Sequence, residues 1–316
     1  MSYIGRRLVL MIPVALLVSF VAFMVIHLVP GDPARVLLGE EATPQLVAQL
    51  DKQLGLDKPL WQQYLFWLGQ AVHGNLGTSI QLQQPVLQAI TQRLPVTLEL
   101  GAAALLFSIV VSVPLGVIAA THRNSPADWL VNVTALFGVA IPNFVLGLLL
   151  ILFLAVTIRL FPPGGYVAFT QDPLQNLRDL VLPMVTLGTG AVAVNLRQVR
   201  SNMLEVLRND YIKTARAKGL TEGRVHYVHA LRNALMPFLT IVGLQAGSIL
   251  AGTFVVETIF LWPGIGQLAV QSILAKDYPV VQGVILLSAL SYMLINLLVD
   301  LGYGVLDPRI SYEKGR

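Results

Sequence analysis

The stretch Asn209–Pro237 reads NDYIKTARAKGLTEGRVHYVHALRNALMP, and it is polar and basic although long apolar runs lie on both sides of it. Residues 195–235 contain eight Lys and Arg against three acidic residues. A short loop with that excess of cations stays on the cytoplasmic side of a membrane. The stretch therefore predicts membrane helices before and after a cytoplasmic basic loop.

The basic loop also contains signals for ordered structure. Its sequence favours a helix from about Ser201 to Lys218, which ends at Gly219, a residue that readily takes the left-handed conformation of a helix C-terminus. Thr221 is a suitable N-cap for a second helix, with Glu222 in its first turn. Two helices joined by a glycine turn on the inner face predict a docking surface for a cytoplasmic partner.

The composition independently places the chain in a bilayer. Of its 316 residues, 55% are hydrophobic and 12% are charged, against about 25% charged in a typical soluble domain. The net charge of +4 comes from cations interleaved with apolar runs, which is not the pattern of a nucleic-acid-binding surface. The chain has no cysteine, so disulfides and thiolate metal sites are excluded.

Six apolar runs are long enough to cross a membrane, so we predict an all-α integral membrane protein with six transmembrane helices. The runs are residues 8–26, 98–120, 129–158, 180–196, 236–256 and 278–299. The third run exceeds the bilayer thickness, and Pro142 inside it predicts a bend. With both termini cytoplasmic, 14 of the 21 Lys and Arg lie on the inner side, which is the orientation that we predict.

The predicted organisation has three parts. Residues 1–29 form the cytoplasmic N-terminus and first transmembrane helix, residues 30–97 an extracytoplasmic helical segment, and residues 98–316 a five-helix core with the cytoplasmic loop 201–235. Short helices in the second part are expected to start at Pro44, Pro59 and Pro85. Whether that part docks a protein partner or only packs on the helix bundle stays open.

The ionisable residues of the spans indicate where the energy for transport comes from. The candidates are Glu99, Glu257 and Asp300, and all three fall at the ends of the predicted spans. An ion-driven carrier normally places such a group near the midplane. No G-x-x-x-x-G-K-[ST] motif occurs either, so the chain has no nucleotide site of its own. We therefore predict a transport subunit that is not itself an enzyme and that draws energy from a partner.

Other functional residues are harder to assign from the sequence. Polar, uncharged candidates for lining a translocation path are Asn143, Asn195, Gln245 and Ser248, although each can equally make a helix–helix hydrogen bond. The five histidines are not clustered in one span and no H-E-x-x-H occurs, so no metal site is expected.

The basic loop resembles the EAA loop of ABC-importer permeases. In KTARAKG (residues 213–219), Ala215 and Gly219 match that motif, while Lys213 and Thr214 replace its Glu and first Ala. The motif's later Ile-x-Leu-Pro corresponds to His-Ala-Leu-Arg here and keeps only Leu231. The longer string ARAKGL…HALRNALMP is similar to the dipeptide/oligopeptide/nickel branch. So are VPGDPA, LGLDKPLWQQY, ETIFLWPGIG, DYPVVQG and NLLVDLGYGVLDPRI, and the whole chain resembles the first-type, dipeptide-permease-B-like subunit.

This resemblance implies a type I ABC importer permease fold in the bacterial cytoplasmic (inner) membrane. The implied partners are a homologous second permease in a heterodimer, an extracytoplasmic substrate-binding protein, and two cytoplasmic ATPases that bind the ATP and magnesium, with no cofactor on this chain. The implied ATPase-coupling residues are Tyr211, Thr214, Ala215, Arg216, Ala217, Lys218, Gly219, Leu220, His229, Leu231, Arg232 and Asn233.

The resemblance favours short peptides as substrates. Glutathione and nickel chelates remain alternatives within the same importer class. An ATP-independent secondary transporter or channel, or a membrane receptor, would leave the coupling-loop string unexplained.

Overall fold

The structure is a computed structural model that describes residues 3–28, 35, 38, 42–54 and 58–306. Over these ranges the chain consists of helices joined by turns and forms no β-strand. The chain divides into two compact units, residues 1–95 with 264–316 and residues 96–263. The predicted division at residues 29/30 and 97/98 stays a prediction.

The first unit contains two long helices that pack against each other, together with shorter ones. The helices are α1 (Tyr3–Leu28), α3 (Pro44–Leu54), α4 (Leu60–Val72), the start of α5 (Val86–Thr121), α12 (Ile265–Leu274) and α13 (Tyr278–Leu306). Gln282 of α13 donates a hydrogen bond to the backbone carbonyl of Phe23 in α1, at 3.1 Å. In agreement with the sequence, α3 begins at Pro44 and α4 directly after Pro59.

A buried aspartate joins two loops of this unit. Asp277, in the turn between α12 and α13, is 1% exposed. Its Oδ2 accepts hydrogen bonds from the Ser79 hydroxyl and, at 3.2 Å, from the backbone N–H of Gln81. The loop before α5 is thereby attached to the last helical hairpin of the chain.

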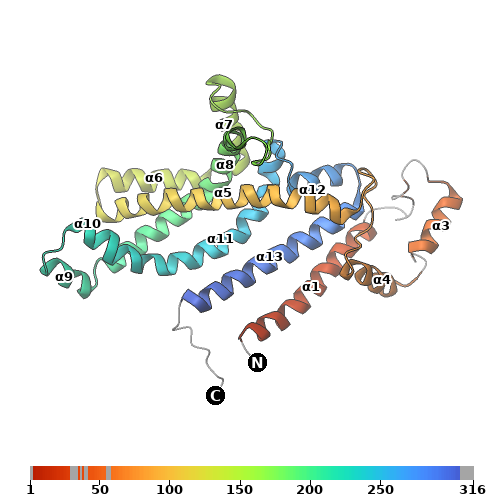
Figure 1. Ribbon diagram of the computed structural model, residues 1–316, viewed down its shortest axis with the longest axis horizontal. Helices are drawn as coiled ribbons and strands as arrows, with labels where there is room; N and C mark the ends of the chain where they lie inside the picture. The colour runs from red at the N-terminus through yellow and green to blue at the C-terminus, as the bar shows by residue number, and fades with distance from the viewer. Residues whose placement is uncertain (1–2, 29–34, 36–37, 39–41, 55–57, 307–316) are drawn as a thin grey trace, which may run out of the picture. The chain divides into compact units, whose positions relative to one another are not determined.

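The second unit is a helix bundle that continues from Val96 in α5. Its elements are α5 (Val86–Thr121), α6 (Pro126–Ala140), α7 (Asn143–Leu150), the π-helical η2 (Ile151–Thr157), α8 (Pro173–Val206), α9 (Asp210–Ala217), α10 (Glu222–Arg224), the π-helical η3 (Val225–Ala230) and α11 (Leu231–Ile259). Helix α8 packs against α6, α7 and α11 (Figure 1). Gly188 lets α8 approach α5, because a Cβ there would lie 2.9 Å from the carbonyl oxygen of Ala104.

A two-pronged ion pair ties α6 to α8 in this bundle. Arg200 Nε and Nη2 lie 2.7 and 2.8 Å from the two carboxylate oxygens of Asp128. The same carboxylate accepts a hydrogen bond from Asn132, so its buried charge is well compensated.

The helix lengths agree with a multi-pass membrane protein. Within the described residues, four helices are long and apolar enough to cross a membrane alone, and there are up to six spans if each of two bent pairs forms one span. One bent pair is α6 with α7 and η2, which meet at 105° next to Pro142, so the predicted bend is confirmed. Proline cannot donate the backbone hydrogen bond of a regular helix, which explains the position of the break.

Two predicted boundaries were wrong. The helix expected at Pro85 and the second span form one helix, α5, which runs through Pro95 because one missing hydrogen bond does not end a long, well-packed helix. The helix expected from Ser201 to Lys218 is interrupted, because α8 ends at Val206 and α9 begins at Asp210.

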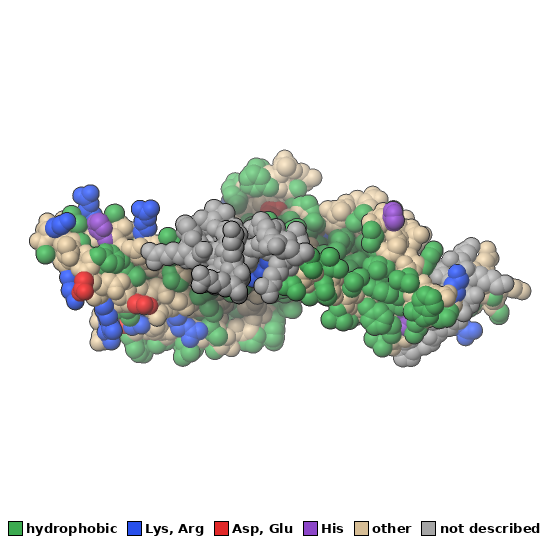
Figure 2. Space-filling model, turned by 90° about the horizontal axis from the view of Figure 1, so that it is seen from below, with side chains coloured by type: hydrophobic (Ala, Val, Ile, Leu, Met, Phe, Trp, Pro, Cys, Tyr) green, Lys and Arg blue, Asp and Glu red, His purple; other side chains and the backbone are tan. Residues whose placement is uncertain are grey.

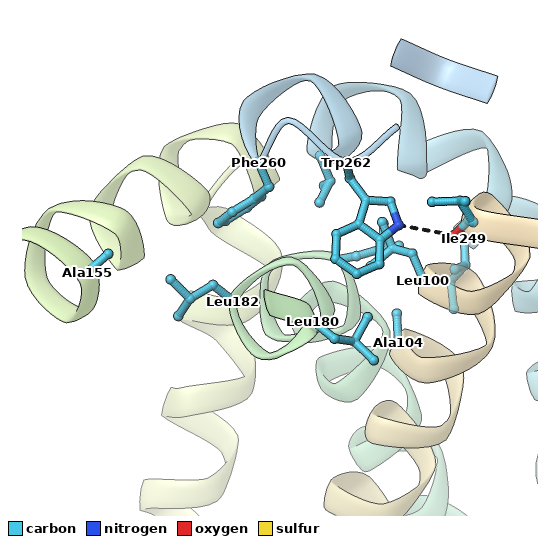
Figure 3. Packing of buried hydrophobic residues seen from close by; sticks show 11 residues of the cluster. Leu100, Ala104, Ala155, Leu180, Leu182, Ile249, Phe260 and Trp262 are labelled. Carbon is cyan, nitrogen blue, oxygen red and sulfur yellow. Dashed lines mark hydrogen bonds between the residues drawn. The ribbon is translucent and has the colours of Figure 1, made fainter. Parts of the chain in front are cut away.

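The largest buried side chain of the second unit, Trp262, lies in its apolar core. Trp262 is fully buried, and its indole N–H donates to the Val96 carbonyl at 3.1 Å (Figure 3). Tyr166 packs edge-on against the indole, with 4.7 Å between ring centres. Phe260 and Leu100 belong to the same apolar cluster. The segment after α11 is therefore connected to the start of the unit by this hydrogen bond and by apolar packing.

The acidic residues near this core are hydrogen-bonded. Glu257, near the end of α11, is fully buried and accepts a 2.7 Å hydrogen bond from Thr97. Glu99 accepts from Tyr166 at 3.0 Å and from Asn176 at 2.7 Å, and it lies inside α5 rather than at a helix end, because α5 starts earlier than predicted. Burial, and then the neighbouring Glu99, raise the pKa of Tyr166 to about 12, so the phenol remains a donor.

Candidate functional site

The short helix α9 is attached to the bundle by one apolar face. Ile212 is fully buried and Ala215 is 8% exposed, and both belong to an apolar cluster with side chains of α5, α8, η3 and α11. Burying an isoleucine contributes about 1.5–3 kcal/mol. The remaining face of α9, including Lys213 and Thr214, is exposed. The helix is therefore held firmly while most of its surface is free for contact.

The turn after α9 is a Schellman motif centred on Gly219. The N–H of Gly219 donates to the Arg216 carbonyl at 2.9 Å, and the N–H of Leu220 reaches the Ala215 carbonyl at 3.4 Å. Gly219 has φ = +79°, a conformation that side-chain-bearing residues rarely adopt. The predicted left-handed stop is confirmed. Thr221 precedes α10 in the predicted cap position, although its side chain makes no capping hydrogen bond.

An ion pair closes the loop around this turn. Arg216 Nε and Nη2 lie 2.9 and 3.1 Å from the Glu222 carboxylate, and His226 Nε2 lies 3.0 Å from the same group. Neither Glu222 nor His226 is among the coupling residues predicted from the sequence. Arg216 and Glu222 are six positions apart, whereas side chains that meet on one helix are three or four apart. They meet because the chain reverses at Gly219.

A second contact links the two sides of the coupling loop (residues 201–235). The Asn233 carboxamide donates to the Tyr211 hydroxyl at 2.9 Å and to the His229 carbonyl at 3.0 Å. Tyr211 belongs to α9 and Asn233 to α11. This hydrogen bond connects α9 directly to the first turn of α11.

The predicted coupling residues fall into two groups. Ala215 is buried, and Leu220 and Leu231 pack against the same apolar cluster, so these three anchor the loop. His229 is half-buried. The exposed group consists of Tyr211, Thr214, Arg216, Ala217, Lys218, Gly219, Arg232 and Asn233. The most buried anchor, Ile212, was not among the predicted residues, although its spacing of three from Ala215 is a usable signal.

The exposed surface of the coupling loop is strongly basic. Figure 2 shows Lys and Arg gathered at the end of the unit that holds α9 and α10. Asp210 pairs with Lys213, and Glu222 pairs with Arg216. The other exposed cations of the loop make no ion pair with a residue in the described part of the chain, and they are Arg208, Lys218, Arg224 and Arg232. Such a surface suits an anionic protein partner.

Three of the four candidate path residues line one cavity in the same unit. A cavity of about 210 Å³ lies between α7, α8 and α11, and Asn143, Gln245 and Ser248 are in its wall. Asn195 is not. Its side chain is fully buried and donates a 3.2 Å hydrogen bond to the hydroxyl of Ser108 in α5, which is the helix–helix alternative left open by the sequence.

Comparison with known families identifies the kind of protein that carries this loop. Residues 112–312 match the family model described as "Binding-protein-dependent transport system inner membrane component". Residues 1–101 match the model of the N-terminal part of such membrane components. The chain belongs to this family. It is a multi-pass transport subunit and not an enzyme on its own, as its sequence predicted.

Curated relatives match along the whole chain. The dipeptide transport system permease protein DppB of Escherichia coli K12 is 44% identical, over 99% of this chain and all of the relative. The protein of the same name from Alkalihalophilus pseudofirmus is 42% identical with the same coverage. The di/tripeptide transport system permease protein DppB of Pseudomonas aeruginosa is 44% identical, again over 99% and 100%.

A solved structure has the same fold. A chain of the inward-facing MetNI methionine ABC transporter aligns with a TM-score of 0.58 at 20% identity, covering 70% of this chain and 97% of the solved one. This likeness bears on the fold alone. It agrees with the type I ABC importer permease fold expected from the coupling-loop string.

Proposed function

We propose that the chain is the permease subunit of an ATP-driven importer of short peptides, in which it forms half of the translocation pathway. The observation that carries the proposal is the arrangement of the coupling loop. It exposes a basic surface on α9 and the Gly219 turn, while Ile212 and the Tyr211–Asn233 hydrogen bond connect that surface to the membrane helices. The peptide permeases among its relatives support the substrate class.

The proposed assembly is based on two features of the chain: it lacks a phosphate-loop motif, and it exposes a basic loop. No G-x-x-x-x-G-K-[ST] motif occurs in its sequence, so two cytoplasmic ATPase subunits would bind ATP and magnesium and dock on the coupling loop. A homologous second permease would form the other half of the pathway in a heterodimer. An extracytoplasmic binding protein would deliver the peptide. The excess of cations in the loop supports an orientation in a bacterial inner membrane with both termini in the cytoplasm.

The test is ATP hydrolysis by the complete complex in liposomes with its binding protein. The ligands are dipeptides, tripeptides, longer peptides, glutathione and nickel chelates, each added separately. We expect short peptides to stimulate hydrolysis and to accumulate inside the vesicles only when ATP is present.

Each other outcome points to a different function. Stimulation by glutathione or a nickel chelate alone would keep the importer and replace its substrate. Uptake by the chain without any ATPase, driven by an ion gradient, would contradict the proposal and indicate a secondary transporter.

A further inference from the structure

The cavity between α7, α8 and α11 contains unused hydrogen-bonding capacity. Gln245 Oε1 is buried and has no partner among the described residues. The Ser248 hydroxyl donates to the Gln245 backbone carbonyl at 3.0 Å, so its oxygen is still available as an acceptor. No hydrogen bond joins the Asn143 carboxamide to another described residue. Of these three groups, Gln245 Oε1 is the buried one, and buried polar atoms are rarely left unpaired, so a ligand or water belongs at that oxygen.

Glycines keep this space open. A Cβ on Gly190 of α8 would meet nothing closer than Asn143 Oδ1, at 3.9 Å, so the volume in front of this glycine is unfilled. A Cβ on Gly252 of α11 would approach the Leu187 side chain to 3.1 Å. Leu187 and Ile249 supply apolar wall. The cavity thus combines an apolar side with a few convergent polar groups, the usual character of a small-molecule site.

The residues that line the cavity determine which part of a peptide can bind there. None of the lining residues is charged, so the site has no partner for a terminal ammonium or carboxylate. Two carboxamides and a hydroxyl instead offer both donors and acceptors, which a peptide group, with one N–H and one C=O, can satisfy. A cavity of about 210 Å³ is smaller than the ~300–1,000 Å³ of sites that enclose a whole drug-sized ligand. It therefore accommodates part of a peptide.

We propose that this cavity is a subsite that binds the backbone peptide group of the substrate, with Gln245 Oε1 accepting its N–H. This inference rests on the proposed function of peptide import. Such a subsite recognises what all peptides share and is indifferent to their side chains. It would select peptides over other solutes within the membrane part of the complex, after the binding protein has released them.

The test compares a peptide with its ester analogue, in which an oxygen replaces the N–H. Uptake of Ala-Ala and of alanyl-lactic acid is measured in liposomes that contain the complete complex and saturating binding protein. The amide-to-ester uptake ratio is determined for the native protein and for Gln245→Met, which keeps the length of the side chain and removes its polar atoms. The binding protein is the same in both, so its own preference cancels.

We expect Gln245→Met to lower the amide-to-ester ratio by about three- to tenfold, the effect of one hydrogen bond. Gln245→Glu retains oxygen acceptors and should keep the native ratio. Thr258→Val is the matched control on α11, because its hydroxyl is exposed and, among the described residues, bonded only to the Phe254 carbonyl, outside the cavity.

An unchanged ratio in Gln245→Met would overturn the subsite. So would an equal fall in the uptake of both compounds, because that result indicates a packing role, for example against the second permease. If the native complex transports neither compound and no peptide stimulates its ATPase, the proposed function fails and the subsite fails with it. If the complex imports peptides but Gln245→Met keeps the native amide-to-ester ratio, the proposed subsite is wrong and the proposed function stands.

Discussion

Replacing Gly219 by valine should reduce peptide uptake at least about tenfold while the subunit remains in the membrane and the complex still hydrolyses ATP. At φ = +79° a β-branched residue stores about 1–3 kcal/mol of backbone strain. Nothing lies within 4 Å of the position of a Cβ there, so the effect comes from the backbone and not from a clash. The turn that orients α9 relative to α10 is expected to relax and to separate ATP hydrolysis from transport.

Two matched variants isolate this cause. Gly223→Val places the same side chain in the same loop, at a glycine with ordinary φ and no neighbour within 4 Å, and should retain near-native uptake. Gly219→Asn tolerates the left-handed conformation and should lose little. Uptake and hydrolysis are measured on the same liposomes. Native uptake by Gly219→Val would contradict a role of the Gly219 turn in coupling ATP hydrolysis to transport.

Replacing Trp262 by alanine should cost about 3–5 kcal/mol of folding stability, the range for deleting a large buried aromatic side chain. The substitution removes a fully buried side chain, its contact with Tyr166 and its hydrogen bond to the Val96 carbonyl. Trp262→Phe retains most of the apolar contact and should lose much less.

The measurement is the midpoint of thermal unfolding of the purified chain in detergent, followed by near-ultraviolet circular dichroism. We expect a large decrease for Trp262→Ala and a small one for Trp262→Phe. A decrease of equal size in both would assign the effect to the hydrogen bond and not to packing. An unchanged midpoint in Trp262→Ala would contradict the assignment of this residue to the core.

Signals that act locally in the sequence predicted local structure well. Apolar run length predicted the membrane helices, Pro142 predicted the bend of the third span, and Gly219 predicted the left-handed turn. The last two signals each depend on one local property, the missing N–H of proline and the missing Cβ of glycine. Pro95 was expected to separate two helices, but its helix-breaking effect was overestimated, because packing keeps α5 continuous there.

Contacts between distant residues were beyond sequence reasoning. The Arg216–Glu222 pair exists only after the chain has turned at Gly219, and no periodicity connects the two residues. Asn195 and Gln245 are both polar residues in apolar helices, yet one is bonded to Ser108 and the other lines a cavity. Which of these happens depends on the rotation of α8 and α11 relative to their neighbours, and that rotation is set by packing.

We propose that the exposed side of α9 contacts an ATPase subunit, and cross-linking tests this contact most directly. The chain has no cysteine, so Ala217→Cys places a single thiol on the exposed end of α9. Gln171→Cys places one on the exposed loop between η2 and α8, whose Gly165 N–H donates to the Phe260 carbonyl after the opposite end of α11. A thiol-and-amine cross-linker applied to the complete complex should join Ala217→Cys, and not Gln171→Cys, to an ATPase subunit. No adduct at Ala217→Cys, or equal adducts at both positions, would contradict the account.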